Sequence, residues 1–322
     1  LPDPSPLTLL HPDPRRPDQT DFGRPGQGLW RLFRFDPVKQ EYREFSQDDP
    51  LFDLKPGRGF WLITRSGGAI TVEGTPNDAS CSFPIQLQPG PNLIATPFNF
   101  AIDWAGCVVP QEGVSRALYG YKEGNYSMDE KVMRPMVGYW VFNETTPPHD
   151  VALLIDPKKC RLDDSTVALA ATSQPNPTAP STTVGWRAKL SVAMEAVKDT
   201  ENYLGGDVVS QDGQDPLDYP EPPPVHELSL SFPHPERSTS WPHYTTDIRS
   251  LSTDAPQVWD FKIQANVAHA QVQLQWDVIG IDGAALTLRD VEGNRVINMG
   301  QLGMYTYDSG DGGVRHFQVT AR

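Results

Sequence analysis

Hydrophobic and polar positions alternate in short runs along most of the chain. In "LWRLFRFDP", for example, Trp30, Leu32 and Phe35 are apolar, and arginines stand between them. Alternation with a period of two is typical of a strand that buries one face. Gly, Pro and Asn turns separate such runs, and no run reaches the about 18 apolar residues that a membrane-spanning helix needs. The pattern therefore predicts an all-β protein without a membrane span.

Two segments carry nearly the same motif. "LKPGRGFWLI" contains Trp61, "MRPMVGYWVF" contains Trp140, and aligning these tryptophans also aligns Gly59 with Gly138. A unit that cannot bury its apolar face alone is often duplicated. We therefore predict an internally duplicated β-domain over residues 28–172, with units of about 28–76 and 115–157. Both glycines are expected where the backbone turns tightly or approaches another segment closely.

The N-terminal residues 1–27 are rich in proline, so we expect an extended arm. Only the "LTLL" stretch has the character of a strand. We predict that it can pair, as a donor strand, with an exposed sheet edge of a neighbouring copy. Head-to-tail contacts of this kind build filaments when they do not close. The candidate donor residues are Leu7, Thr8, Leu9 and Leu10.

The second half of the chain is predicted to be a separate β-domain. Residues 173–183 are rich in Ser, Thr and Pro, which is typical of a linker. From 184 to 322, alternating runs follow one another at turn-separated spacing, which indicates an immunoglobulin-like or jelly-roll β-sandwich. In "KLSVAMEAVKDTENYL", residues 189–204, good helix formers favour a helix instead. We predict a strand for its first half.

Composition narrows the range of partners and locations. The chain has 32 Pro and 26 Gly, which interrupt helices and favour short strands with many turns. The net charge is −14 and no basic patch is present, so we expect no nucleic-acid partner. The chain begins at Leu1 without the pattern of a signal peptide. Either a signal peptide has been removed, or the sequence is a piece of a longer protein.

The three cysteines, Cys81, Cys107 and Cys160, contain no CxxC pair, so their spacing does not indicate a zinc site. In an exported protein they allow one disulfide with one thiol left over, and the spacing leaves the pairing open.

An acid-rich stretch, "DTENYLGGDVVSQDGQDPLDYPEPPP", is the strongest candidate for a metal site. Calcium prefers hard oxygen ligands in a turn-rich loop, although the spacing here is not that of an EF-hand. The alternative is that Asp and Asn simply cap turns beside Gly and Pro. The acids from Asp212 to Glu221 recur every third residue, which places them along one side of an extended run. The candidate calcium ligands are Asp199, Asn202, Asp207, Asp212, Asp215 and Asp218.

Other candidate chemistry is sparse. We find no nucleophile elbow, zinc-protease, phosphate-binding or dinucleotide motif, and therefore predict that the chain is not an enzyme. His234, His243 and Asp247 match no zinc spacing and are expected in loops and at strand edges. Among the tryptophans, Trp241 is the one expected in a loop, where its ring can stack on a sugar.

Several motifs resemble those of modules in large secreted bacterial surface proteins. They are "WRLFRF", "PGRGFWLI", "LQPGPNLIATPF" and "GYWV", in the order in which that family carries them. The family usually has a tryptophan where this chain has Pro91, so we expect that turn to differ. The stretch from Asp199, together with "YTTDIR", resembles a β-sandwich that precedes a C-terminal sorting domain in the same proteins.

The resemblance implies an extracellular or outer-surface location and a structural or adhesive role, with calcium as a plausible ligand. It supplies no catalytic residues. We predict a structural protein, a cell-surface or filament subunit that contacts further copies of itself or other surface proteins. One alternative is a carbohydrate-binding or adhesive module that binds glycans. The other is a non-catalytic ancillary part of a secreted hydrolase.

Overall fold

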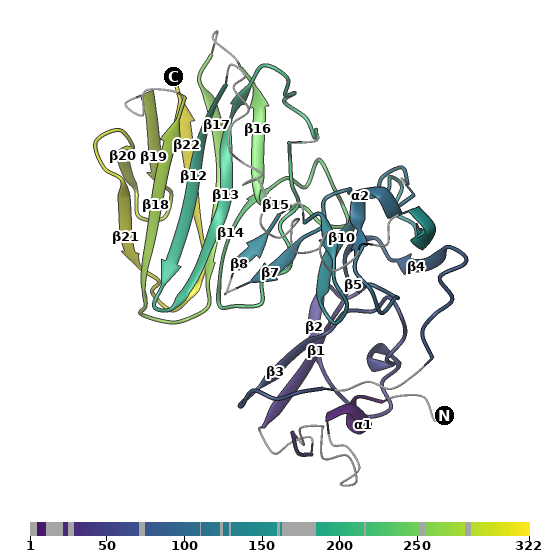
Figure 1. Ribbon diagram of the computed structural model, residues 1–322. Coiled ribbons are helices and arrows are strands. Elements are labelled where there is room, and N and C mark those ends of the chain that lie inside the picture. Colours follow the sequence, from purple (N-terminus) through teal and green to yellow (C-terminus); the bar gives the residue numbers. More distant parts are fainter. Residues whose placement is uncertain are drawn as a thin grey trace. The chain divides into compact units, whose positions relative to one another are not determined.

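The computed structural model describes residues 5–10, 22–24, 29–70, 75–109, 111–122, 125–128, 130–159, 162, 185–215, 217–251, 255–280 and 285–322. The chain is nearly all β, as predicted (Figure 1). It forms two compact units, one of residues 1–120 with 129–174, the other of 121–128 with 175–322. The predicted linker, residues 173–183, lies outside the described residues.

The first unit contains short elements. They are α1 (Pro6–Leu10), β1 (Trp30–Asp36), β2 (Glu41–Glu44), the 3-10 helix η1 (Pro50–Phe52), β3 (Trp61–Thr64), β4 (Phe83–Leu87), β5 (Gly90–Ala95), β6 (Ile102–Asp103), α2 (Trp104–Cys107), β9 (Val132–Met133), β10 (Gly138–Asn143), β11 (Val151–Ile155) and the 3-10 helix η2 (Pro157–Lys159).

Alternation along β1 produces the first core of this unit. Trp30, Leu32 and Phe35 are buried, as predicted, and β1 lies between β2 and β3 in an antiparallel sheet. A second core forms around the antiparallel pairs β4–β11 and β5–β10, where Leu87 and Leu153 are fully buried. The unit is therefore built from several small sheets rather than one large one.

The two similar motifs have different surroundings. Trp61 lies in β3 beside β1 and is partly exposed, whereas Trp140 lies in β10 beside β5 and is buried. A Cβ atom on Gly59 would lie 2.8 Å from the backbone oxygen of Ile94, so the expected close approach is confirmed there. The nearest atom to a Cβ on Gly138 would be 3.4 Å away, an ordinary contact. Duplication of the unit stays a prediction.

The segment predicted to act as a donor strand is helical in this structure, and its pairing with a neighbouring copy stays a prediction. The structure makes a short helix, α1, of Leu7, Thr8, Leu9 and Leu10. Proline fits the first position of a helix, and Pro6 stands there. Leu7 and Leu10, three residues apart, then share one helix face. Leu10 is buried beside Phe22 and Trp30, so burial of this face stabilises the helix over a strand.

The cysteines are in two states. Cys107 forms a disulfide, whereas Cys81 is an exposed free thiol. Cys160 lies outside the described residues.

The second unit contains longer strands and one hairpin from the middle of the chain, β7 with β8. Its elements are β7 (Gly120–Lys122, from its second residue on), β8 (Asn125–Ser127), β12 (Gly185–Met194), β13 (Val197–Asp207), β14 (Leu228–Pro233), β15 (His243–Tyr244), β16 (Thr246–Ser250), β17 (Gln257–Ala265), β18 (Gln271–Ile279), β19 (Leu286–Asp290), β20 (Arg295–Asn298), β21 (Met304–Asp308) and β22 (Gly313–Ala321).

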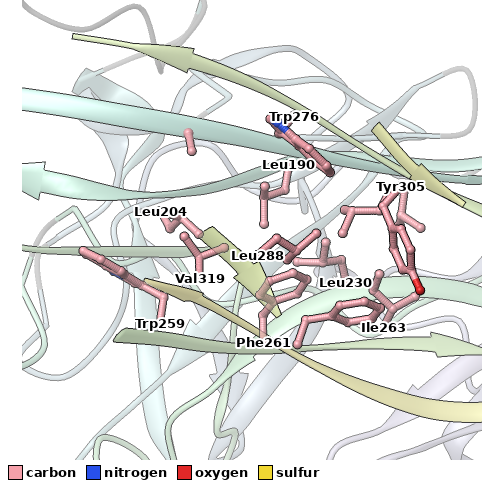
Figure 2. Packing of buried hydrophobic residues seen from close by; sticks show 14 of the residues in the cluster. Leu190, Leu204, Leu230, Trp259, Phe261, Ile263, Trp276, Leu288, Tyr305 and Val319 are labelled. Carbon is pink, nitrogen blue, oxygen red and sulfur yellow. The ribbon is translucent and has the colours of Figure 1, made fainter. Parts of the chain in front are cut away.

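Two sheets form the sandwich in this unit, as predicted. Their strand orders are β16-β13-β12-β18-β21 and β15-β14-β17-β22-β19-β20. Buried and less buried positions alternate strictly along β12, so every second side chain enters the core. Figure 2 shows the result, with Leu190 and Trp276 from one sheet packed near Phe261 and Leu288 from the other.

The ambiguous segment 189–204 forms a hairpin of two strands, so the strand prediction is confirmed and the helix alternative is wrong. The turn contains Glu195 at a positive φ of 53°, and Met194 pairs with Val197. A β-bulge follows, where the register shifts between Leu190 and Val192. Because paired residues share a face, the bulge directs Asp199 and Asn202 toward the inner face of the sandwich.

Candidate functional site

The second unit holds a small pocket of about 30 Å³, room for a water molecule or a group of similar size. It lies between the bulged part of β13, the segment before β14 and the β7–β8 hairpin. Its walls include the rings of Tyr121 and Tyr126 and two prolines, Pro222 and Pro224. Its charged lining includes Lys198, Asp199, Glu201 and Glu221.

Asp199 reaches the pocket because of the bulge in β13. Its carboxylate accepts hydrogen bonds from the Leu230 backbone N–H (2.6 Å) and from Asn202 Nδ2 (2.7 Å). Leu230 belongs to the other sheet, so Asp199 joins the two sheets at this end. Burial raises the pKa of Asp199 to about 6; the two hydrogen bonds oppose the rise, and the charge of Glu201 adds to it.

Glu221 is held in place by its backbone. Its N–H donates to His243 O (2.9 Å), and its carbonyl accepts from Trp241 Nε1 (2.6 Å). Only 6% of the residue is exposed. Burial raises the pKa of its carboxyl group well above the usual value, and the nearby charge of Asp199 adds to this, whereas a hydrogen bond with Thr245 opposes it.

The Thr245 hydroxyl lies among several acceptors. Thr245 Oγ1 donates to the Glu201 carbonyl at 2.6 Å. A hydroxyl has a single hydrogen to donate. Asn202 Oδ1 lies 3.2 Å from the same hydroxyl, and the Glu221 carboxylate is a third acceptor beside it. These three groups therefore share a single donor.

The third carboxylate, Glu201, is neutralised within the protein. Lys189 Nζ lies 2.8 Å from Glu201 Oε1, and the Tyr203 hydroxyl donates to Oε2 at 2.7 Å. In the described part of the chain, by contrast, no Lys, Arg or His forms an ion pair with Asp199 or Glu221. The pocket therefore contains two acids without a positive partner among the described residues, the buried Glu221 and the half-buried Asp199.

The β7–β8 hairpin closes one side of the pocket. The Tyr126 hydroxyl donates to Pro223 O at 2.7 Å, and the Tyr121 hydroxyl forms a hydrogen bond with His226 Nε2. The two tyrosine rings meet edge to face, 5.2 Å between centroids. Aromatic walls thus stand beside buried carboxyl groups.

The six predicted calcium ligands do not meet in one place. Asp199 and Asn202 lie in β13, not in a loop. Asp207 ends that strand and pairs with Arg187 at 2.9 Å. Asp212 accepts a hydrogen bond from the Ser250 hydroxyl (2.5 Å).

The last two predicted ligands, Asp215 and Asp218, bond mainly to backbone groups. Asp215 caps a turn by accepting from Gln211 N and Leu217 N, which is the predicted alternative to calcium. Asp218 accepts from Ile248 N. Within the described ranges, no three His, Cys, Asp or Glu side chains are grouped so that they could hold a metal ion. Calcium binding itself stays a prediction.

A buried ionic cluster, which the sequence did not reveal, lies in the same unit. Arg237 lies 3.1 Å from Asp218 Oδ2 and 3.0 Å from Asp247 Oδ1. Asp247 also pairs with Arg249 (2.7 Å) and with His234 (3.1 Å). Burial acts to raise the pKa of Asp247, yet its bonds with His234 and Arg249 hold it well below the usual range. Opposite charges thus compensate one another here.

Trp241 is buried, which counts against the predicted stacking of its ring on a sugar. It does lie in a loop, before β15, but only 7% of it is exposed. Its ring packs edge to face against His243, with 5.0 Å between centroids, and its indole N–H bonds to Glu221 O. Trp241 thus positions the backbone of a pocket residue.

Glu221 and Thr245 were not predicted as site residues. The signal for Glu221 in the sequence is an acid between prolines, "YPEPPP", where the neighbouring rings favour burial. Thr245, before β16, carries no local signal of a site.

Comparison with known protein families, curated proteins and solved structures finds no match to this chain. The resemblance to secreted bacterial surface proteins therefore stays a prediction. None of the helices in the described part of the chain is long and apolar enough to cross a membrane.

Proposed function

We propose that this chain is a non-enzymatic structural module of an exported, surface-located protein, and that it binds further copies of itself through an open edge of its sandwich. The observation that carries this proposal is the position of β20 and β21. They end the six-stranded and five-stranded sheets, and among the described residues each pairs with one strand only, β19 and β18 respectively. The free side of such a strand offers backbone N–H and C=O groups to another chain.

Exposed apolar side chains on the same edge support the proposal. Val296 in β20 is 71% exposed, Met304 in β21 is 46% exposed, and Leu302 lies between them at 54%. Alternation turns Tyr305 and Tyr307 of β21 into the core, so Met304 stands on the outer side. Strand addition would combine backbone hydrogen bonds with burial of these side chains.

Two further features shape the proposal. A disulfide at Cys107 favours an oxidising compartment, which supports export. The helical form of α1 removes the support for strand donation by the N-terminal arm. We therefore propose edge-to-edge pairing of two sandwiches in place of arm donation.

Sedimentation velocity over a range of concentrations, together with electron microscopy, tests this association. The test variant is Val296→Lys with Met304→Lys, because charges protect an edge strand from pairing. The matched control is Val314→Lys, which has the same 46% exposure as Met304 but lies in β22, between β17 and β19. We expect wild type and control to associate with rising concentration, and the double variant to stay monomeric.

A wild-type chain that is monomeric at every concentration would overturn the proposal. Equal loss of association in the Val314→Lys control would overturn it as well, since general surface charge rather than the open edge would then govern association.

A further inference from the structure

The pocket has more negative than positive side chains in its lining. Asp199 and Glu221 are close enough for their charges to repel, and Glu221 is buried whereas Asp199 is half-buried. Burying a carboxylate is costly unless a positive group or several hydrogen-bond donors compensate it. Glu201, on the same strand as Asp199, has such a partner in Lys189. A positive group placed between Asp199 and Glu221 would compensate their charges, as Lys189 compensates that of Glu201.

The protein does not supply that group from the described residues around the pocket. Lys198 lines the pocket and is exposed, but it forms no ion pair with a described residue. The Thr245 hydroxyl favours the charged form of the Glu221 carboxyl, but its single hydrogen is shared with Glu201 O and Asn202 Oδ1. Glu221 is thus a nearly fully buried acid that lines a cavity, and no positive side chain among the described residues forms an ion pair with it.

The shape and lining of the cavity favour an ammonium group over a metal ion as the positive group that binds there. A metal ion would need converging ligands, and the described acids do not converge in that way. An ammonium group is a point charge with three donors, and carboxylate oxygens accept such bonds. The rings of Tyr121 and Tyr126 suit a cation, whose charge is attracted to aromatic faces. The neighbouring Pro222 and Pro224 suit an alkyl stem.

We propose that this pocket binds the ammonium group of a primary amine, with Glu221 and Asp199 as its acceptors and the tyrosine and proline side chains around its stem. Two sources share this chemistry: a free alkylamine and the side chain of a lysine in another protein.

Binding then releases a proton. The Glu221 carboxyl carries a proton in the free protein when its raised pKa lies above the pH. An incoming ammonium ion keeps its own proton and stabilises the carboxylate, so the proton of Glu221 leaves to solvent. Affinity therefore rises with pH until the amine itself loses its charge. The other titratable groups that face the pocket are Lys198, Asp199, Glu201, His226, Tyr121 and Tyr126.

Isothermal titration of the full chain with n-butylamine tests the proposal, and n-butanol serves as the uncharged probe. The test variant is Glu221→Gln, which keeps the shape and removes the charge. The control is Glu227→Gln, the same change on an exposed acid outside the pocket lining. We expect wild type and control to bind butylamine equally and not to bind butanol. In Glu221→Gln the affinity should fall at least about tenfold, the loss expected for a charge-assisted hydrogen bond.

Titration of the wild type in two buffers with different ionisation heats measures proton release and does not depend on any variant. Release of protons near neutral pH, with tighter binding at higher pH, supports the proposal. Failure of the wild type to bind butylamine even at millimolar affinity overturns it, and so does binding without proton release.

A third titration separates the two sources. A short peptide with one lysine is compared with the same peptide in which that lysine is acetylated, a change that removes the charge. Tighter binding of the unmodified peptide than of butylamine assigns the site to a protein lysine. Tighter binding of butylamine assigns it to free amines.

Discussion

Two groups of buried acids lie in the same sandwich unit, and they have opposite electrostatic surroundings. Asp247 lies beside two arginines, Arg237 and Arg249, and the ring of His234, and its pKa is held below the usual range. Glu221 is buried to a similar degree, but it has a carboxylate and a hydroxyl as neighbours, and its pKa is raised well above the usual value. Burial is therefore common to both groups, and the neighbours decide the direction of the shift.

The difference separates a structural role from a binding role. A compensated cluster stabilises the fold only while it is complete, because removal of one charge leaves its partner buried and unpaired. An uncompensated acid destabilises the fold and is available to a ligand of opposite charge. The two groups should therefore respond in opposite directions when a charge is removed.

The largest effect is expected for Arg237→Met. The Arg237 side chain is 4% exposed and its guanidinium contacts both Asp218 and Asp247, so its loss leaves two buried carboxylates short of a partner. We expect a loss of about 3–5 kcal/mol in the free energy of unfolding. Urea denaturation, followed by tryptophan fluorescence of this unit, measures it.

The matched control removes an arginine from an exposed ion pair. Arg31 and Glu44 are 2.8 Å apart, with side chains 57% and 48% exposed. We expect Arg31→Met to change stability much less than Arg237→Met does. Equal effects of the two variants would contradict the role given to the buried cluster.

The second prediction has the opposite sign. Glu221→Gln should stabilise the protein at pH 8 by about 1–3 kcal/mol, because it removes an uncompensated buried charge. The folded-state pKa of Glu221 is raised, so its favourable contribution is present at low pH and is lost as the pH rises through that pKa. The gain from the substitution should therefore grow from pH 4 to pH 8 and be small at pH 4.

Chemical denaturation of wild type and Glu221→Gln across that pH range makes the comparison, with Glu227→Gln as the control of equal charge change. A Glu221→Gln variant that is less stable than wild type at pH 8 would show that the charged carboxylate has a partner.

Much of the fold could be predicted from the sequence because period-two patterns report directly which face of a strand is buried. β12 alternates strictly between buried and less buried positions, and β1 does so from Trp30 to Leu32 before the pattern shifts at Phe35. The "LTLL" segment forms a helix where a strand is predicted, because a short run of apolar residues fits a helix and a strand equally well. Burial against Trp30 decides between them, and that contact joins residues distant in sequence.

The candidate site was predicted only in part, because its residues meet through tertiary structure. Asp199 was singled out, but as a loop residue, whereas a bulge in β13 directs it inward. Thr245 reaches Glu201 because β16 runs parallel to β13, a pairing without a local sequence signal. The acids of the acid-rich stretch that begins at Asp199 differ in role because their partners lie in other segments of the chain. Arg237, for example, is the partner of Asp218.

A smaller loss of stability is expected where an ion pair is partly exposed to water. Lys189 and Glu201 form an ion pair whose side chains are 33% and 27% exposed, between the two extremes. Lys189→Met should reduce stability by about 1 kcal/mol or less, since water screens such a pair. Denaturation at low and at high salt measures it, and the loss should shrink at high salt. A loss as large as that of Arg237→Met would remove the distinction between buried and half-exposed pairs.

The smallest expected effect is a change in the pKa of Glu221 when the charge of Asp199 is removed. Asp199→Asn removes a charge that raises the pKa of Glu221, but keeps an oxygen to accept the Leu230 N–H. The pKa of Glu221 should therefore fall, although burial still holds it above the usual value. Carbon-13 NMR titration of the Glu221 carboxyl measures this in the variant, in wild type and in Asp311→Asn, a control at an exposed acid. An unchanged pKa in Asp199→Asn would mean that burial alone governs Glu221, and that the two acids do not act together on a ligand.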